Sequence, residues 1–244
     1  RGYSMNRFLK RAWAEIDLDA LTHNYNEIKK LAKGKEILAV VKANAYGHDD
    51  KAVCLKLQEL GVKYYGVSNL WEGEKLRQHG ITGTILTFGY TDEDYFDELL
   101  EYGITQTAGS VQYAKELSDY AVSKGVKLPV HIKVNTGMTR VGIDTEEEML
   151  EILSMPGLDC KAAYTHFAAA DSLDPSDVDY TNKQQEKLMK TASDKGLLIH
   201  SQNSGGIVYH GDFGGDIVRA GVILYGHCPN YPLEVPFEMK SVMT

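Results

Sequence analysis

Hydrophobic and polar positions follow two periods along most of this chain. Short runs of apolar, often β-branched residues are typical of buried strands, whereas apolar residues spaced three or four apart mark one face of a helix. The clearest run, residues 37–41, ends at Lys42 and a polar turn with Tyr46 and Gly47. From this run onward the pattern predicts eight strands, at residues 37–41, 64–68, 84–88, 105–108, 129–134, 161–166, 197–202 and 217–224.

A helical segment follows every strand but the last, and one helix precedes the first strand. The predicted helices cover residues 20–32, 52–60, 72–79, 92–102, 111–124, 146–154 and 180–194, with a short turn at 206–209. Repeated βα units imply parallel strands with right-handed crossovers. Eight units in 244 residues favour a closed (β/α)8 TIM-type barrel. A doubly wound sheet is the alternative, but no Gly-x-Gly-x-x-Gly motif follows the first strand.

Two segments lie outside these units. Residues 13–18 alternate between apolar and polar, which predicts an extra strand, with Asp19 capping the helix after it. Residues 229–244 are rich in proline and end as a further strand begins. We therefore expect a barrel domain at 12–228, a basic tail or linker at 1–11, and at 229–244 a linker and the start of a truncated C-terminal β domain.

The composition, 43% hydrophobic and 25% charged, is that of an ordinary globular protein. A net charge of -8 argues against nucleic acid as a partner, because phosphate binding needs a basic face. The three cysteines are too far apart for a disulfide framework or a metal cluster, so we expect a reducing, cytoplasmic compartment and no metal. No apolar run approaches the length of a membrane span. The basic tail reads as a solvated segment, or alternatively as a linker cut from a membrane-anchored protein.

Polar side chains stand at the C-terminal ends of the predicted strands, where barrels of this kind carry their active sites. Desolvation of Lys42 at such an end would lower its pKa and make its amine a nucleophile towards aldehydes. Ser204 follows the predicted seventh strand, and Gly221 lies towards the end of the predicted eighth. Barrels of this kind commonly bind a phosphate at these positions. A nucleophilic lysine and a phosphate site predict pyridoxal 5′-phosphate, which forms a Schiff base with lysine. Other cationic or titratable residues near strand ends are Lys133, Arg140, His166 and Arg219.

Each residue also has a purely structural interpretation. Lys42 alone could extend its amine from a strand end into solvent. Gly205-Gly206 alone favours a tight turn, His166 could be a core histidine, and Arg140 and Arg219 could neutralise carboxylates. Their shared position at strand ends is what favours a site. Ordinary loop or surface roles are expected for Asp171, Asp174-Pro175 and the acidic stretch 92–101.

The order of these motifs resembles the alanine racemase family, pyridoxal phosphate enzymes of fold type III. The matching segments run from about residue 12 to residue 226: Val41-Lys42-Ala43-Asn44-Ala45-Tyr46-Gly47-His48, His131-Ile132-Lys133-Val134-Asn135-Thr136-Gly137-Met138 with Arg140 and Gly142, Thr165-His166-Phe167-Ala168, Asn203-Ser204, and Arg219-Ala220-Gly221 with Leu224-Tyr225-Gly226. The resemblance implies an enzyme that interconverts L- and D-alanine, or L- and D-serine, and supplies D-amino acid for the cell wall.

The resemblance also implies how the cofactor is held. Lys42 would bind it covalently and act as the base on one face of the substrate Cα. Its phosphate would be bound by Tyr46, Ser204, Gly221 and Val222. In this family the second base is a tyrosine of a C-terminal domain, contributed by the other subunit of a homodimer. No position in this sequence matches that tyrosine, so this segment alone is expected to be inactive or weak.

Four further roles around the cofactor ring follow from the resemblance. Arg219 would face the pyridine nitrogen and keep it unprotonated, because adjacent cations repel. The ring is then a weaker electron sink, which suppresses transamination. His166 would support the ring and Arg219, while Arg140 would bond the phenolic oxygen. Lys133, carbamylated in many relatives, would orient Arg140.

Some positions depart from the family pattern. Asp49-Asp50 stands where glycine usually follows the histidine of the motif, and Asn135 replaces a more usual aspartate. Residues 83–86, Thr105-Gln106-Thr107 and Asn135 look like the serine/alanine racemases of vancomycin resistance, cytosolic domains tethered to a membrane segment. Two alternatives use the same barrel: a pyridoxal phosphate-binding homeostasis protein without racemase activity, and a lyase or decarboxylase. The latter enzymes generally present an acidic residue to the pyridine nitrogen, which Arg219 argues against.

Overall fold

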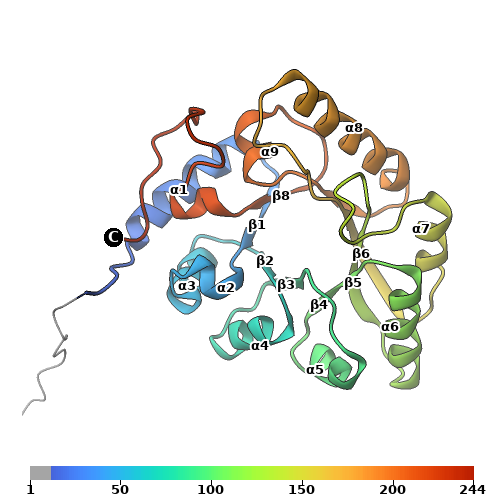
Figure 1. Ribbon diagram of the computed structural model, residues 1–244. Helices are drawn as coiled ribbons and strands as arrows, with labels where there is room; N and C mark the ends of the chain where they lie inside the picture. Colours follow the sequence, from blue (N-terminus) through green and yellow to red (C-terminus); the bar gives the residue numbers. More distant parts are fainter. Residues whose placement is uncertain (1–11) are drawn as a thin grey trace, which may run out of the picture.

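The computed structural model describes residues 12–244, and the basic tail expected at 1–11 lies outside the described residues. Eight parallel strands close into a barrel in sequence order, with β8 paired to β1. Helices surround the ring of strands (Figure 1). The (β/α)8 barrel predicted from the sequence is confirmed, and the doubly wound alternative is wrong. The strands are β1 Glu36–Val40, β2 Tyr64–Val67, β3 Thr84–Thr87, β4 Thr105–Ala108, β5 Leu128–Lys133, β6 Leu158–Tyr164, β7 Leu198–His200 and β8 Ile217–Ala220.

The helices follow the predicted order. No helix of residues 12–244 combines the length and the apolar content that crossing a membrane requires. Two short 3₁₀ segments, η1 Glu93–Tyr95 and η2 Val222–Tyr225, accompany the helices. The helical elements are α1 Leu18–Leu31, α2 Lys42–Tyr46, α3 Asp50–Glu59, α4 Leu70–Gln78, α5 Phe96–Glu101, α6 Val111–Ser123, α7 Glu146–Leu153, α8 Pro175–Ala192 and α9 Ser204–Tyr209.

Both faces of the barrel wall are buried, which explains the continuous apolar run of β1. Ile37 and Ala39 belong to the core between strands and helices. The alternate residues lie inside the barrel, where four buried side chains form a separate cluster: Leu38, Val40, Leu86 and Ile217. A strand that is covered on both sides shows no polar alternation, so its sequence reads as an unbroken hydrophobic segment.

The strand predicted at residues 13–18 is wrong. Ile16 forms only a single antiparallel bridge, with Met243 near the other end of the chain. The Asp17 carboxylate accepts hydrogen bonds from the N–H groups of Asp19 and Ala20, both at 2.9 Å, and so caps α1. This cap draws the end of the predicted strand into the helix, which begins two residues before its expected start.

Other boundaries also differ from the prediction, among them the start of α8 and the end of β8. Helix α8 begins at Pro175 rather than at residue 180, because Asp174 and Pro175 occupy its N-cap and first position. These two residues are therefore part of a helix start, not the ordinary loop that was expected. Strand β8 ends at Ala220, and residues 222–225 turn into η2 instead of extending the strand to 224.

A left-handed turn follows β1. Residues 43–46, none of them glycine, have φ between 52° and 54°. L-amino acids avoid this conformation by roughly 1–2 kcal/mol per residue. The Glu72 carboxylate of α4 accepts the N–H of Ala43 at 2.8 Å and the N–H of Ser68 at 2.7 Å. Glu72 of α4 thus ties the backbone immediately beside Lys42 to the residue that follows β2.

The departure at Asp49-Asp50 is accommodated by the local backbone. Asp49 has φ of 66°, a conformation that favours glycine, and its side chain accepts the N–H of Ala52 at 3.0 Å to cap α3. Asp50 is buried and pairs with Lys75 at 2.9 Å. Each aspartate therefore makes a side-chain interaction that glycine could not.

Candidate active site

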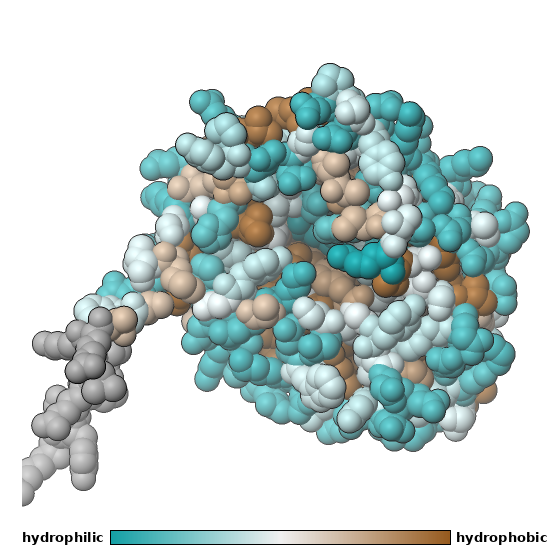
Figure 2. All heavy atoms as spheres, in the orientation of Figure 1, coloured by the Kyte–Doolittle hydropathy of each residue, from teal (hydrophilic) through white to brown (hydrophobic). Residues whose placement is uncertain are grey.

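A cavity of about 420 Å³ lies at the C-terminal ends of the strands. Figure 2 shows a hollow near the centre of the face that it displays, where polar and apolar surfaces meet. All nine predicted site residues line the cavity: Lys42, Tyr46, Lys133, Arg140, His166, Ser204, Arg219, Gly221 and Val222. The structure thus brings together residues from five separate stretches of the sequence.

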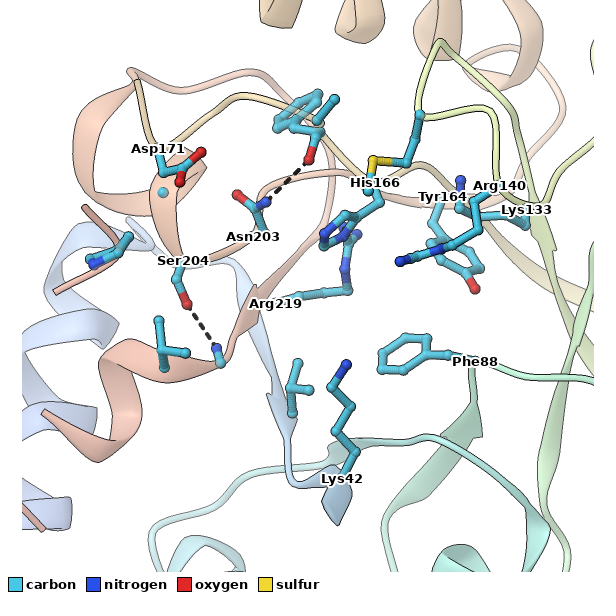
Figure 3. Close-up of a pocket in the computed structure, with 18 of the residues that line it drawn as sticks. Lys42, Phe88, Lys133, Arg140, Tyr164, His166, Asp171, Asn203, Ser204 and Arg219 are labelled. Atoms are coloured by element: carbon cyan, nitrogen blue, oxygen red, sulfur yellow. Dashed lines mark hydrogen bonds between the residues drawn. The ribbon is translucent and has the colours of Figure 1, made fainter. Parts of the chain in front are cut away.

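The Lys42 amine points into the cavity (Figure 3). Lys42 is half-buried and comes directly after β1 and Val41, at the start of the left-handed turn. Val40 and Phe88 line the wall beside it. A primary amine placed in this way can meet a carbonyl carbon held inside the cavity.

Two hydroxyl groups converge on the backbone at Gly221. The Ser204 hydroxyl accepts the N–H of Gly221 at 3.0 Å. A Cβ built on Gly221 would stand 3.3 Å from the Tyr46 hydroxyl and 3.4 Å from the Ser204 hydroxyl, so glycine keeps the space between them open. Burial raises the pKa of Tyr46, which keeps its hydroxyl protonated as a donor. Two hydroxyls around a bare backbone suit a phosphate group.

Arg219 is a buried cation held by backbone carbonyls. Its guanidinium donates to the carbonyl oxygens of Thr165 at 2.7 Å, His200 at 2.9 Å and Ser201 at 2.9 Å. Within residues 12–244 no carboxylate forms an ion pair with it. Burial lowers the pKa of Arg219 to about 10, so it remains charged at neutral pH. The cavity therefore contains a fixed positive charge at Arg219.

The histidines around Arg219 are neutral. Burial and neighbouring cations lower the pKa of His166 to about 3, and burial lowers the pKa of His131 to about 3. Arg219 can only donate, so the His200 Nδ1 at 3.2 Å is an acceptor. His200 then carries its proton on Nε2 and donates to the His131 Nδ1 at 3.1 Å. One guanidinium thereby fixes the tautomers of two buried imidazoles.

Lys133 sits on the opposite side of the pocket from Ser204, beside Arg140 (Figure 3). It is buried, donates to the Val134 carbonyl at 2.9 Å and lies 5.5 Å from the centre of the Tyr164 ring. Burial, with Arg219 and Arg140 nearby, lowers the pKa of Lys133 to about 7. A substantial fraction of this amine is therefore neutral at physiological pH, the form that reacts with carbon dioxide.

Several cavity residues were not singled out by the sequence. The Tyr164 ring stacks on His200 with centroids 4.6 Å apart, and its hydroxyl lies 2.9 Å from that of Thr107. Asp171, expected to be an ordinary loop residue, also lines the cavity, as does Phe88. His131 and Lys133 are polar residues at alternate positions of β5, so both point to the inner face of the barrel. This pattern in the sequence could have indicated polar side chains inside the barrel. Among residues 12–244 no group of three or more His, Cys, Asp or Glu side chains is placed to hold a metal.

Residues 16–229 match the family model described as alanine racemase, N-terminal domain. Alanine racemase of Clostridium perfringens strain SM101 is 41% identical over 236 residues, covering 93% of this chain and 60% of that protein. Alanine racemase 1 of Caldanaerobacter subterraneus subsp. tengcongensis is 38% identical over 240 residues, covering 94% and 61%. This chain thus spans about 60% of the length of these relatives.

Solved structures similar to this chain also include racemases. Alanine racemase of Clostridium difficile 630 superimposes with a TM-score of 0.88 at 34% identity, covering 97% of this chain and 64% of that one. Alanine racemase of Bacillus anthracis with bound L-Ala-P has a TM-score of 0.87 at 29% identity, covering 98% and 64%. A histidine racemase of Leuconostoc mesenteroides also reaches 0.87, at 28% identity, covering 98% and 66%.

Proposed function

Because this chain belongs to the alanine racemase family, we propose that it is the barrel domain of a pyridoxal phosphate-dependent amino-acid racemase. The observation that carries the proposal is one cavity that holds Lys42, the hydroxyl cradle at Gly221 and the buried Arg219. Pyridoxal 5′-phosphate, the cofactor of this family, supplies an electron sink that makes the Cα–H bond of an amino acid acidic. Residues 12–228 would form the cofactor domain, and 229–244 would begin the next.

The residues of the cavity fit this cofactor. Its phosphate would be held by Tyr46, Ser204, Gly221 and Val222. The hydroxyls of Tyr46 and Ser204 can donate hydrogen bonds and lie beside the Gly221 backbone, where no side chain fills the space. Lys42 would bind its carbonyl carbon and, when released, remove or return a proton at the substrate Cα. The amine and the hydroxyl cradle line one cavity, which supports this division of labour.

The cationic groups would tune the bound ring. Arg219 would face the pyridine nitrogen, and a guanidinium with a pKa of about 10 disfavours a second positive charge beside it. Neutral His166 would pack at the ring and accept from Arg219, whose NH2 lies 3.4 Å from its Nδ1. Arg140 would bond the phenolic oxygen, and Lys133, as a carbamate, would orient Arg140 as an anionic partner.

Racemisation needs a second base, because the proton must leave one face of Cα and return on the other. We infer that this base lies on a C-terminal domain and reaches the cavity from the second subunit of a homodimer, as the family resemblance implies. The cavity is open at the strand ends, which leaves room for such a contribution. Residues 12–244 alone would then exchange the Cα proton weakly or not at all.

The substrate would be alanine or serine, and the product would supply D-amino acid for the cell wall. Asn135 and Thr105-Gln106-Thr107 support a likeness to the serine/alanine racemases of vancomycin resistance, and Thr107 contacts the Tyr164 hydroxyl in the layer below the cavity. A cytoplasmic location is supported by three free cysteines, one of them buried.

Two measurements test the function. Borohydride reduction of the protein with pyridoxal 5′-phosphate, followed by peptide mass analysis, should place the cofactor on Lys42 and lose this label in Lys42→Ala but not in the exposed-lysine control Lys51→Ala. Deuterium incorporation at Cα of alanine and serine should be fast with the full-length protein and slow with residues 1–244. Label that persists in Lys42→Ala contradicts the cofactor assignment.

Activity measurements on the full-length protein also separate the racemase from the homeostasis protein and the decarboxylase. Cofactor bound to Lys42 in a full-length protein that exchanges no Cα proton would favour the homeostasis protein. Loss of the substrate carboxylate as carbon dioxide would favour a decarboxylase. Full racemase turnover by residues 1–244 would contradict the claim that the second base lies outside them.

A further inference from the structure

The loop that carries Arg140 is anchored at its base. Residues 135–143 leave the barrel after β5 and return, and Arg140 is exposed on this loop while it lines the cavity. The N–H of Asn135 donates to the Ile143 carbonyl at 2.8 Å, and the N–H of Ile143 donates to the Lys133 carbonyl at 2.9 Å. Arg140 therefore extends from a fixed base, and its position depends on how the rest of the loop is held.

The Asn135 side chain reaches to the residue before Arg140. Its Oδ1 accepts the N–H of Gly137 at 3.2 Å and the N–H of Thr139 at 3.0 Å. Thr139 has φ of 52°, a conformation that a threonine adopts only when its surroundings hold it. The amide of Asn135 is thus one of the contacts that keep the backbone beside Arg140 in this strained form.

Asp144 explains why residue 135 is an amide. The Asn135 Nδ2 donates to the Asp144 carboxylate at 2.9 Å, so the amide uses its oxygen for two N–H donors and its nitrogen for one acceptor. An aspartate at 135 would still accept the two N–H groups, but it would place two carboxylates within hydrogen-bond distance. The departure from the usual aspartate is therefore matched to the charge of Asp144.

We propose that Asn135 and Asp144 form a positioning pair that sets the place of Arg140 in the cavity. Neither side chain is among the described residues that line the cavity, so the pair acts through the loop rather than on a ligand. The inference rests on the proposed function, in which Arg140 contacts the cofactor. It assigns a role to two residues outside the cofactor-binding set.

The test compares kcat and KM of the full-length, cofactor-loaded protein with those of three variants. Asn135→Asp should lower kcat/KM roughly tenfold through charge repulsion and displacement of Arg140. Asp144→Asn should cost less, because the new amide still accepts from Asn135. Combining both changes should restore kcat/KM to within about threefold, since the new amide can donate to the new carboxylate. Asn26→Asp, the same substitution at an exposed position of α1, is the control.

A second comparison separates positioning from general damage. On an Arg140→Ala background, Asn135→Asp should cause no further loss, because its effect passes through Arg140; a general folding defect would still add. Amide hydrogen exchange of residues 136–142 should rise in Asn135→Asp and return to normal in the double variant. Normal kcat/KM in Asn135→Asp, or no rescue in the double variant, overturns the proposal. If the wild type does not racemise, the proposed function fails, and unchanged exchange in Asn135→Asp still overturns the pair.

Discussion

Glu72 is the residue whose removal should most directly release the turn beside Lys42. Its carboxylate binds two backbone N–H groups, those of Ala43 and Ser68, and so ties the left-handed turn to the end of β2. Hydrogen bonds to a charged group contribute about 1.5–3 kcal/mol each. Because Glu72 is only half-buried, we take the lower value for both, which gives about 3 kcal/mol for Glu72→Ala.

The stabilisation by Glu72, about 3 kcal/mol, offsets part of the conformational strain in the left-handed turn. Four residues in the left-handed region cost roughly 4–8 kcal/mol. Glu72→Ala should therefore lower the unfolding free energy by about 3 kcal/mol and the exchange protection of residues 43–47 by about 100-fold. Glu72→Gln should lose about half as much, because one amide oxygen replaces two carboxylate oxygens.

Urea denaturation followed by circular dichroism measures the first quantity, and hydrogen exchange with mass analysis measures the second. Glu116→Gln is the matched control, since Glu116 is exposed on α6 and accepts from Gln112. If Glu72→Gln changes stability and protection no more than Glu116→Gln does, Glu72 does not hold the turn.

Three further predictions follow from the site and its loop. The neutral fraction of Lys133 rises as pH increases through about 7, so a ¹³C carbamate signal under labelled carbon dioxide should rise over the same range and vanish in Lys133→Arg; a constant signal would contradict the lowered pKa. The folded state also binds fewer protons there than the unfolded state, in which the lysine titrates near 10.5, so the contribution of Lys133 to stability rises with pH from about 7 to 10.5. His166, with a pKa of about 3, should show no imidazole NMR titration near its ordinary 6.5, and its contribution to stability should fall as pH drops from 6.5 towards 3; a midpoint near 6.5 would refute this. Gly142→Ala should cost roughly 2 kcal/mol of unfolding free energy, because φ is 138° and its Cβ would stand 2.5 Å from the Asn135 nitrogen, whereas Gly211→Ala, with open space around it, should be near neutral; equal effects would contradict this.

The barrel was predictable because strands such as β1 are buried on both faces and read as short apolar runs that alternate with helical segments. The position of Lys42, Ser204 and Arg219 at strand ends then followed from topology alone. Boundaries failed where residues outside the periodic pattern decide them, as the Asp17 side chain does for α1 and Pro175 at the first position does for α8. The spacing of hydrophobic residues carries no information about the residues at which a helix begins.

The finer structure of the site depends on contacts between distant segments. Ala, Asn, Ala and Tyr at 43–46 give no local reason for a left-handed turn, which is held by Glu72 from another βα unit. The neutral state of His200 and the lowered pKa of Lys133 arise from burial and from the nearby Arg219, which a linear sequence does not display. Three-dimensional packing, not residue type, sets these properties.

The charge distribution of the cavity has a kinetic consequence. The chain carries a net charge of -8, yet four of the five Lys, Arg, Asp and Glu side chains that line the cavity are basic, Asp171 being the exception. An approaching anion is repelled at long range and attracted at contact. Salt at about 0.1 M screens fields beyond roughly 10 Å, so it weakens the distant repulsion before the contact attraction. Moderate salt should thus speed the entry of an anionic ligand, the reverse of the usual salt effect at a basic site.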